Sequence, residues 1–82
     1  MITFLKPEEQ HQHKNGGGWV ANTVTIEDSV YVAPTAQVYG NARVYGDARV
    51  YGDAQVSGNA WVYGDAWVSG DAQVSGNALV SG

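Results

Sequence analysis

Aliphatic residues return at every sixth position along most of this chain, and this pattern is its strongest structural signal. They are Val20, Ile26, Val32, Val38, Val44, Val50, Val56, Val62, Val68, Val74 and Val80. A small or β-branched residue stands four positions after each of the first ten, and from Val38 onward the unit reads Val-(Tyr/Ser)-Gly-(Asn/Asp)-Ala-x. A helix is disfavoured, because each glycine would cost it about 1 kcal/mol. The unit predicts a short strand, Ala-x-Val-(Tyr/Ser), whose Ala and Val point inward, followed by a corner at Gly-(Asn/Asp).

A longer period lies on top of the first. The hexad Gln-Val-(Tyr/Ser)-Gly-Asn-Ala begins at Gln37, Gln55 and Gln73, and the hexads between carry Asp where this one carries Asn. The structural unit is therefore eighteen residues, which a three-sided coil explains: each hexad forms one side, and residues eighteen apart stack directly. The predicted columns are Thr25–Arg43–Trp61–Leu79, Tyr31–Arg49–Trp67 and Trp19–Gln37–Gln55–Gln73, with Thr23, Asn41, Asn59 and Asn77 at one corner.

The tandem Gly-Asn-Ala-x-Val-Tyr-Gly-Asp-Ala units resemble the bacterial hexapeptide-repeat family, and most of all its phage and prophage-type members. The resemblance covers residues 20–82 and implies an all-β fold, a left-handed parallel β-helix with three hexapeptides per triangular coil and about 3.5 coils. The left hand comes from the resemblance alone, because parallel crossovers in general are right-handed. Residues 19–82 are expected to form the β-helix, and residues 1–18 an N-terminal capping segment or a flexible tail.

The two ends of a solenoid need cover, because a terminal coil exposes unpaired backbone groups and a section of the core. Ile2-Thr3-Phe4-Leu5 is expected to add a strand or to lay Phe4 and Leu5 over the core opening, and Gly16-Gly17-Gly18 to act as a flexible joint. The repeats run in register to the last residue without a cap. Three ways of covering that end stay open: another copy, a different partner, or a longer native chain. A homo-oligomer is favoured.

Aromatic and arginine side chains gather on two of the three predicted outer faces. Arg43 is predicted to lie over Trp61, and Arg49 over Trp67, as cation–π neighbours worth about 0.5–1 kcal/mol each when exposed. Contiguous aromatic surface is typical of an association site, with ordinary cross-strand packing as the alternative. The Gln and Asn columns are predicted to form side-chain amide ladders. The candidate contact residues are Arg43, Tyr45, Arg49, Tyr51, Trp61, Tyr63 and Trp67.

Charge and composition narrow the choice of partners. The 82 residues carry a formal net charge of −4, all of it in the repeats, and contain no cysteine. Nucleic acid is disfavoured as a partner, because phosphate binding needs clustered Lys and Arg. No apolar run reaches the roughly 18 residues of a membrane span, and the apolar stretch from Met1 to Leu5 is too short for a signal peptide. No membrane contact and a cytoplasmic location are therefore expected.

The resemblance implies that the enzymes of the family are acyltransferases. Their active sites would lie between adjacent β-helices of a trimer, and they would carry a general-base His and a long loop that interrupts the repeat. This chain departs on both of the last two points, because its repeats contain no His and no insertion breaks them. Exposed Asp corners do not titrate near neutrality without burial, so they are poor general acids or bases. No catalytic residue and no cofactor are predicted.

Metal binding is disfavoured as well. His11 and His13 lie in the N-terminal segment, where a pair of ligands without a carboxylate or Cys makes a poor site. Stacked corner carboxylates would repel one another, which leaves a bridging divalent cation open as an alternative. The two stacked pairs are Asp47 over Asp65 and Asp53 over Asp71.

The favoured function is a non-catalytic structural or interaction module. It would be a rigid β-helical prism that self-associates or binds a protein partner through its aromatic faces or its open C-terminal end. One alternative is a truncated or degenerate hexapeptide-repeat acyltransferase subunit, which would bind acyl-coenzyme A. The other is a small acidic phage-type protein that inhibits a host factor by surface mimicry, which would capture a basic partner through its corner Asp side chains.

Overall fold

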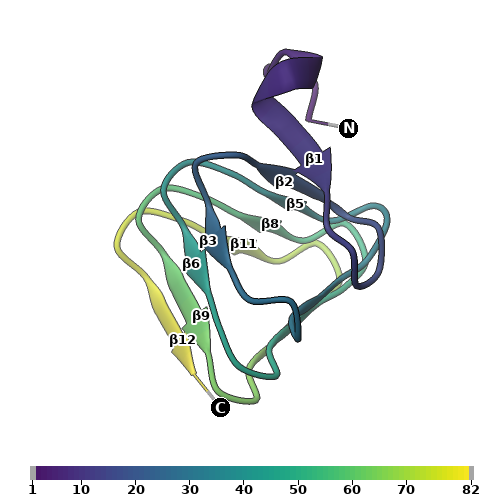
Figure 1. Cartoon of the computed structure of the whole chain (residues 1–82). Helices are drawn as coiled ribbons and strands as arrows, with labels where there is room; N and C mark the ends of the chain where they lie inside the picture. The colour runs from purple at the N-terminus through teal and green to yellow at the C-terminus, as the bar shows by residue number, and fades with distance from the viewer. Residues whose placement is uncertain (1, 82) are drawn as a thin grey trace.

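The computed structural model describes residues 2–81, which wind into a β-solenoid (Figure 1). A 3₁₀ helix, η1, precedes twelve strands within this range. The elements are η1 Pro7–Glu9, β1 Gln10–Gln12, β2 Trp19–Ala21, β3 Thr25–Ile26, β4 Tyr31–Val32, β5 Gln37–Val38, β6 Arg43–Val44, β7 Arg49–Val50, β8 Gln55–Val56, β9 Trp61–Tyr63, β10 Trp67–Val68, β11 Gln73–Val74 and β12 Leu79–Ser81.

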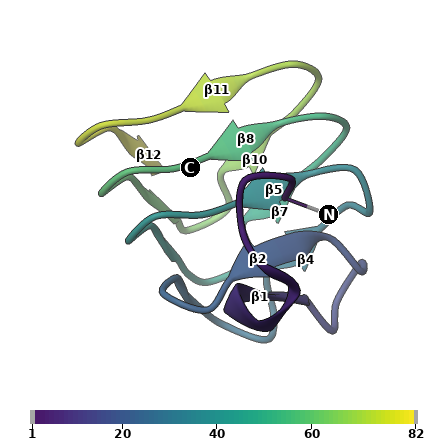
Figure 2. The same cartoon turned by 90° about the horizontal axis from the view of Figure 1, so that it is seen from above.

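Successive repeat strands join three different sheets in turn. The sheet orders are β1-β2-β5-β8-β11, β10-β7-β4 and β12-β9-β6-β3. Three strands therefore complete one coil, and about four coils lie on top of one another, as the row of β2, β5, β8 and β11 in Figure 2 shows. The predicted all-β parallel β-helix is confirmed, while its left hand and triangular outline stay predictions.

The pairing register is the predicted one. Gln37 pairs with Gln55 and Gln55 with Gln73, and every parallel pair likewise joins residues eighteen apart. A slip by one residue would turn each inward side chain to the outer face. The register therefore confirms all three predicted strand columns, Thr25–Arg43–Trp61–Leu79, Tyr31–Arg49–Trp67 and Trp19–Gln37–Gln55–Gln73.

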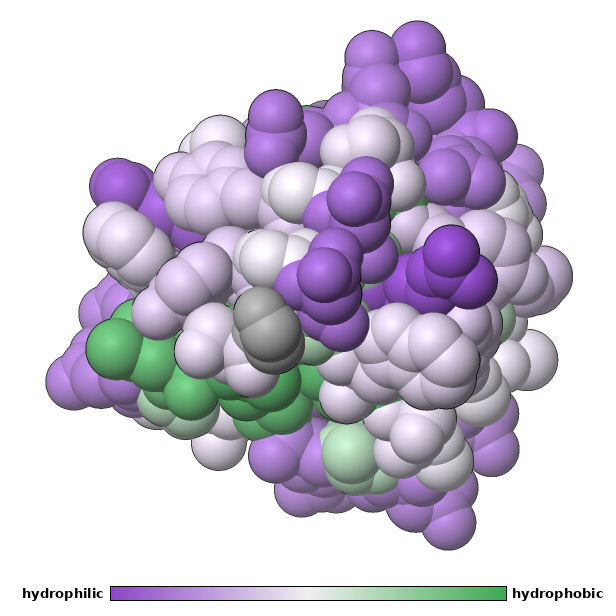
Figure 3. Space-filling model, turned by 90° about the horizontal axis from the view of Figure 1, so that it is seen from below, coloured by the Kyte–Doolittle hydropathy of each residue, from purple (hydrophilic) through white to green (hydrophobic). Residues whose placement is uncertain are grey.

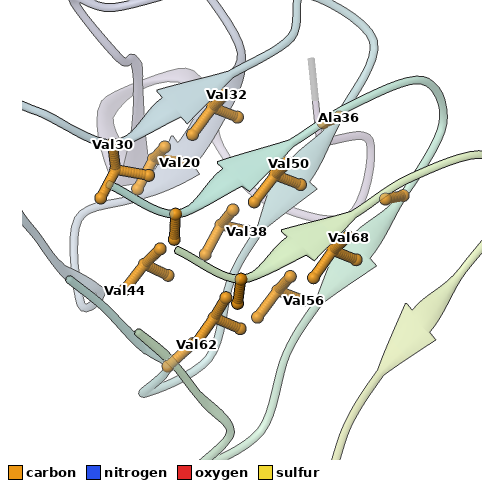
Figure 4. Close-up of a cluster of buried hydrophobic side chains, with 14 of the residues drawn as sticks. Val20, Val30, Val32, Ala36, Val38, Val44, Val50, Val56, Val62 and Val68 are labelled. Atoms are coloured by element: carbon orange, nitrogen blue, oxygen red, sulfur yellow. The ribbon is translucent and has the colours of Figure 1, made fainter. Parts of the chain in front are cut away.

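Valine and alanine fill the core, as the six-residue pattern predicts. Valines from all three sheets point toward the axis in Figure 4. Val38, Val44, Val50, Val56 and Val62 are fully buried, and each contributes about 1.5–3 kcal/mol relative to an exposed side chain. The alanines between them are also buried, from Ala36 to Ala66. In the last coil Val74 and Val80 are only partly buried, because no further strand packs on β11 or β12 within residues 2–81.

Glycine makes the corners from the second coil onward. Gly40 and Gly58 have φ of 74° and 68°, in the left-handed region that favours glycine. The two residues also stack, since a Cβ on Gly40 would lie 2.8 Å from the Gly58 nitrogen. In the described part of the chain, the N–H of the residue after the corner glycine then donates to the next coil in four cases, as where the Asn41 N–H donates to the Gly58 carbonyl at 2.9 Å.

The first coil turns its corners without glycine, a device the sequence analysis missed. Its corners are Asn22-Thr23, Asp28-Ser29 and Pro34-Thr35, and within residues 2–81 no residue other than glycine has a positive φ. In this coil a Ser or Thr hydroxyl donates to the next coil, in place of the backbone N–H that follows the corner glycine in later coils. Ser29 Oγ donates to the Gly46 carbonyl at 2.6 Å, and Thr23 and Thr35 donate in the same way to Gly40 and Gly52.

The N-terminal segment reaches the first coil differently from the expectation. Its strand is β1, which pairs antiparallel with β2, whereas residues 2–5 form no strand. Phe4 is 64% exposed and meets the outward ring of Tyr39 edge to face at 4.8 Å. The segment therefore lies against the outer face of β2 and β5, as Figure 2 shows, so the expected placement of Phe4 and Leu5 over the core opening is wrong.

Buried Gln10 explains this path. Its Oε1 accepts from the Ile2 N–H at 2.8 Å, while its Nε2 donates to the carbonyls of Ile2 and Leu5 at 3.0 and 3.1 Å. One side chain thus satisfies backbone groups that a buried Ile2 would otherwise leave unpaired. The amide folds residues 2–6 back outside the sheet, away from the end of the core.

Two of the three consecutive glycines, Gly16 and Gly18, lie in close packing. The Gly18 N–H donates to the Val32 carbonyl at 2.9 Å, and the Val32 N–H donates to the Asn15 carbonyl at 3.0 Å. A Cβ on Gly16 or Gly18 would overlap atoms of Val32. These two glycines are thus required by close approach, a reason other than the predicted joint.

Candidate functional site

The predicted contact residues lie on two different sheets. The first aromatic face is Arg43, Tyr45, Trp61 and Tyr63, on the sheet of β3, β6, β9 and β12. The second aromatic face is Arg49, Tyr51 and Trp67, on the sheet of β4, β7 and β10. The eighteen-residue stacking brings together the members of each face.

The first aromatic face contains an apolar groove of about 480 Å³, lined by Tyr45, Trp61, Tyr63 and Leu79. Tyr45 and Trp61 meet edge to face, with ring centroids 6.3 Å apart. Trp61 is 40% exposed and Leu79 is 65% exposed, although both are large apolar side chains. Leu79 was not among the predicted contact residues, yet its place in the Trp61 column could have identified it.

Arg43 borders this groove and stacks on its tryptophan. The guanidinium carbon lies 5.3 Å from the Trp61 ring centroid, so the predicted cation–π contact is confirmed. On the other side of Trp61, Arg43 lines a polar hollow of about 410 Å³ with Thr25 and Asn41. The tryptophan thus separates an apolar groove from a polar one.

The second aromatic face is a run of rings in tilted and edge-to-face contact. Tyr31, Tyr51 and Trp67 follow one another with centroid separations of 5.5 and 5.6 Å. Arg49 lies 5.8 Å from the Trp67 centroid, which confirms the second predicted cation–π contact, and its Nη1 donates to the Tyr51 hydroxyl at 3.3 Å. That hydrogen bond raises the pKa of Arg49, so the guanidinium stays charged. Tyr31 was missed by the sequence analysis, although it precedes Arg49 in its column.

A shallow hollow opens beside Arg49 and Tyr51. It measures about 300 Å³ and is also lined by Tyr31, Asn15 and Ser29. Asn15 is held there because its Nδ2 donates to the Ser29 carbonyl at 3.2 Å. The N-terminal segment therefore supplies part of the edge of the second aromatic face.

The third sheet is more polar. The Gln column occupies its outer face, and Gln55 Oε1 accepts from the Tyr39 hydroxyl at 3.4 Å. A continuous amide ladder along Gln37, Gln55 and Gln73 stays a prediction. This face has no counterpart of the Arg–Trp pairs among the described contacts.

The two histidines of the N-terminal segment make hydrogen bonds to the first coil. His13 is buried, and its Nε2 lies 2.7 Å from the Val30 carbonyl, which can only accept, so this nitrogen carries a proton. His11 Nδ1 lies 2.6 Å from Asn22 Oδ1. Within residues 2–81 no three His, Cys, Asp or Glu side chains gather where they could hold a metal ion.

One exposed ion pair joins the N-terminal segment to the first coil. Lys14 Nζ lies 2.9 Å from Asp28 Oδ2. Hydrogen bonding and charge attraction from Lys14 lower the pKa of Asp28 below its usual 3.8. In the described part of the chain, no helix has the length and apolar character to cross a membrane.

Hydrophobic surface is unevenly distributed. Figure 3, which views the molecule from below relative to Figure 1, shows one hydrophobic patch bordered by residues of intermediate hydropathy, with hydrophilic residues further out. The largest exposed apolar side chains are Phe4, Trp61, Trp67 and Leu79. Three of these four lie on the two aromatic faces or in the groove.

Four stretches of the chain match the model of one protein family, described as the YdcK Beta solenoid repeat: residues 36–52, 42–55, 54–70 and 72–82. Together they cover more than half of the chain, contain every strand from β5 to β12, and include all seven predicted contact residues. No curated protein and no solved structure matches the chain.

Proposed function

Because the chain belongs to the YdcK beta solenoid repeat family, we propose that it is a non-catalytic structural and interaction module. In this proposal the solenoid is a rigid support that self-associates through its aromatic faces. The finer identity, a left-handed hexapeptide-repeat protein of phage or prophage type that works in the cytoplasm, is part of the same proposal. The regular six-residue spacing of β2 to β12 supports the hexapeptide-repeat part of that identity.

The observation that carries the proposal is the exposed apolar groove of Tyr45, Trp61, Tyr63 and Leu79. Large apolar side chains in a contiguous exposed patch are typical of association sites. A whole aromatic side chain buries about 150–250 Å², and association would cover the exposed part of it, 40% for Trp61, at roughly 25 cal/mol per Å². Tyrosine, tryptophan and arginine are also the residues most enriched at the energetic centres of interfaces.

The size of the molecule fits such a contact. A stable interface covers about 800 Å² on each partner. The protein has 4435 Å² of accessible surface, so this area is less than a fifth of the total. One of the three sheet faces is therefore large enough to form such an interface.

Charge also favours a second copy as the partner. Asp47 and Asp65 occupy the corner between the two aromatic faces, close enough to act on the charge of Arg49. A second copy brings the same arginines and the same acidic corner, so arginine from one copy can meet aspartate from the other. Its aromatic rings can pack edge to face with those of the first.

The oligomeric state tests the proposal. Sedimentation equilibrium over a range of protein concentrations should give a mass above that of one 8.7 kDa chain. Trp61→Ser should lower that mass to one chain where the first aromatic face is used, and Trp67→Ser where the second is used. The variant that lowers the mass therefore identifies the face. Gln55→Ser is the matched control, because it changes an outward strand residue on the third sheet. A single-chain mass for the unaltered protein at all concentrations would refute the proposal.

The non-catalytic part has its own test. Titration calorimetry with acetyl-coenzyme A should give no heat of binding. Saturable binding would favour the acyltransferase-subunit alternative instead.

A further inference from the structure

The chain covers two of its three sheet edges at the N-terminal end of the solenoid. β1 pairs with the outer side of β2, and residues 15–18 bond the outer side of β4 through Val32. In the third sheet β3 is the last strand, and no strand within residues 2–81 pairs with its outer side. Figure 1 shows β1 beside β2, with β3 at the free edge of its own sheet.

The free edge of β3 offers backbone hydrogen-bonding groups. The Thr25 N–H donates to the Ala42 carbonyl at 3.0 Å, and the Glu27 N–H donates to the Val44 carbonyl at 3.1 Å. Backbone groups alternate in direction along a strand. The N–H and C=O of Ile26 therefore point away from β6, toward the unoccupied side.

The side chains at this edge also lack one layer of cover. Val24 and Ile26 are only partly buried, whereas Ala42 and Val44, one coil further on, are fully buried. Both layers carry inward-facing aliphatic residues, so the difference comes from the strand that is missing above β3. The Glu27 side chain does not fill the gap, because it turns toward the next coil and accepts from the Gly46 N–H at 2.7 Å.

The layers on either side of the free β3 edge limit what can bind there. β1 and residues 15–18 each add one layer, about 4.8 Å high, on either side of β3. The blunt end of a second solenoid would meet these two layers before it reached β3. A single extended strand fits between them and would pair with β3 as β1 pairs with β2.

We infer that the outer edge of β3 is a docking site for an extended segment of a partner protein, which adds one strand to the sheet. The segment bonds the N–H and C=O of Ile26 and places one aliphatic, preferably β-branched, side chain inward over Val24 and Ile26. Its neighbouring residues face outward and are polar. This is strand addition, in which backbone bonds give affinity and alternate side chains give selectivity. The site is separate from the aromatic faces.

A peptide copied from β6 is a direct probe, because β6 is the strand that β3 already accepts on its other side. The acetylated and amidated hexapeptide Asn-Ala-Arg-Val-Tyr-Gly, residues 41–46, is titrated to millimolar concentration into the isotope-labelled protein. The Ile26 amide resonance should shift saturably, and its hydrogen exchange should slow by about tenfold. The same peptide with Val replaced by Asp should leave both unchanged.

Ile26→Pro provides the matching protein variant. Proline is tolerated on an edge strand whose N–H faces outward, so the bonds to β6 are kept while the outward donor is lost. Peptide binding should be abolished, with circular dichroism reporting that the fold is retained. If that variant does not fold, the Asp peptide still decides the question.

Three results would overturn the inference. The first is an Ile26 amide that does not respond, even where the peptide shifts residues elsewhere on the protein. The second is an equal response to the Asp peptide. The third is protection of Ile26 that grows with protein concentration without peptide, which would identify a second copy as the occupant. None of these results depends on the aromatic faces, so the aromatic-face proposal can fail or succeed independently.

Discussion

Gly58→Ala is the substitution that most sharply tests the stacked corners. Gly58 has a φ of 68°, and a Cβ there would lie 2.8 Å from the nitrogen and 3.0 Å from the oxygen of Gly76 in the next coil. Both atoms belong to the backbone, so neither can swing aside as the end of a side chain would. The substitution must therefore spread two coils apart or twist the corner.

Gly70→Ala is the matched control. Its φ is 65°, almost the same, but a Cβ there meets nothing within 4 Å. A left-handed conformation costs an L-residue about 1–2 kcal/mol, and the stiffer unfolded chain returns about 0.4–1 kcal/mol. Gly70→Ala should therefore lose about 1 kcal/mol. Gly58→Ala should lose a further 1–3 kcal/mol or so, the usual cost of overpacking.

Thermal and urea unfolding followed by circular dichroism measure the difference. In a domain of this size each kcal/mol lowers the melting temperature by about 4–8 °C. Gly58→Ala should thus melt well below Gly70→Ala, which in turn melts slightly below the unaltered protein. Equal losses for the two variants would refute the reasoning, because they would show that the corners are strained but not in contact.

Substitutions at three further positions test contacts outside the regular repeat. Thr35→Val removes the hydroxyl that donates to Gly52 and should cost about 1 kcal/mol in urea unfolding, whereas Thr35→Ser should be nearly neutral. Gln10→Leu keeps the side-chain bulk but leaves buried backbone groups unpaired, and should cost about 1–3 kcal/mol and raise proteolysis of residues 2–6. The pKa of Asp28 is lowered by Lys14, so its stabilising contribution is present above the unfolded value of 3.8 and is lost as the pH falls through the folded value. Asp28→Asn should remove that part of the acid dependence of stability, and an unchanged profile would contradict it.

The repeats could be predicted from the sequence because their signal is local and regular. Val44 and Ala48 repeat a pattern that only an inward-facing strand explains, and the eighteen-residue period alone predicts that Arg43 lies over Trp61, as it does in the structure. The same alignment places Thr23 at the corner where Asn41 stands one coil later. It does not predict that the Thr23 hydroxyl donates to the Gly40 carbonyl, because the first coil lacks the corner glycine.

The N-terminal segment was harder to predict, because its contacts depend on backbone groups distant in the sequence. In the sequence nothing distinguishes Gln10 from other polar residues, because its role depends on hydrogen bonds to the carbonyls of Ile2 and Leu5. His13 is buried, and its ring donates a hydrogen bond to the Val30 carbonyl, seventeen residues away. Neither residue belongs to a repeat, so no periodic pattern could indicate its partner.

A pair of introduced cysteines tests the eighteen-residue coil most directly, since the natural chain has none. Gln55 and Gln73 are paired in neighbouring coils, at a strand spacing of about 4.8 Å that lies within disulfide reach. Gln55→Cys with Gln73→Cys should form an intramolecular disulfide under mild oxidation, detected by mass spectrometry of the denatured protein. Arg49→Cys with Gln55→Cys, which are closer in sequence but lie on different sheets, should not. A disulfide in the second pair and none in the first would contradict the account.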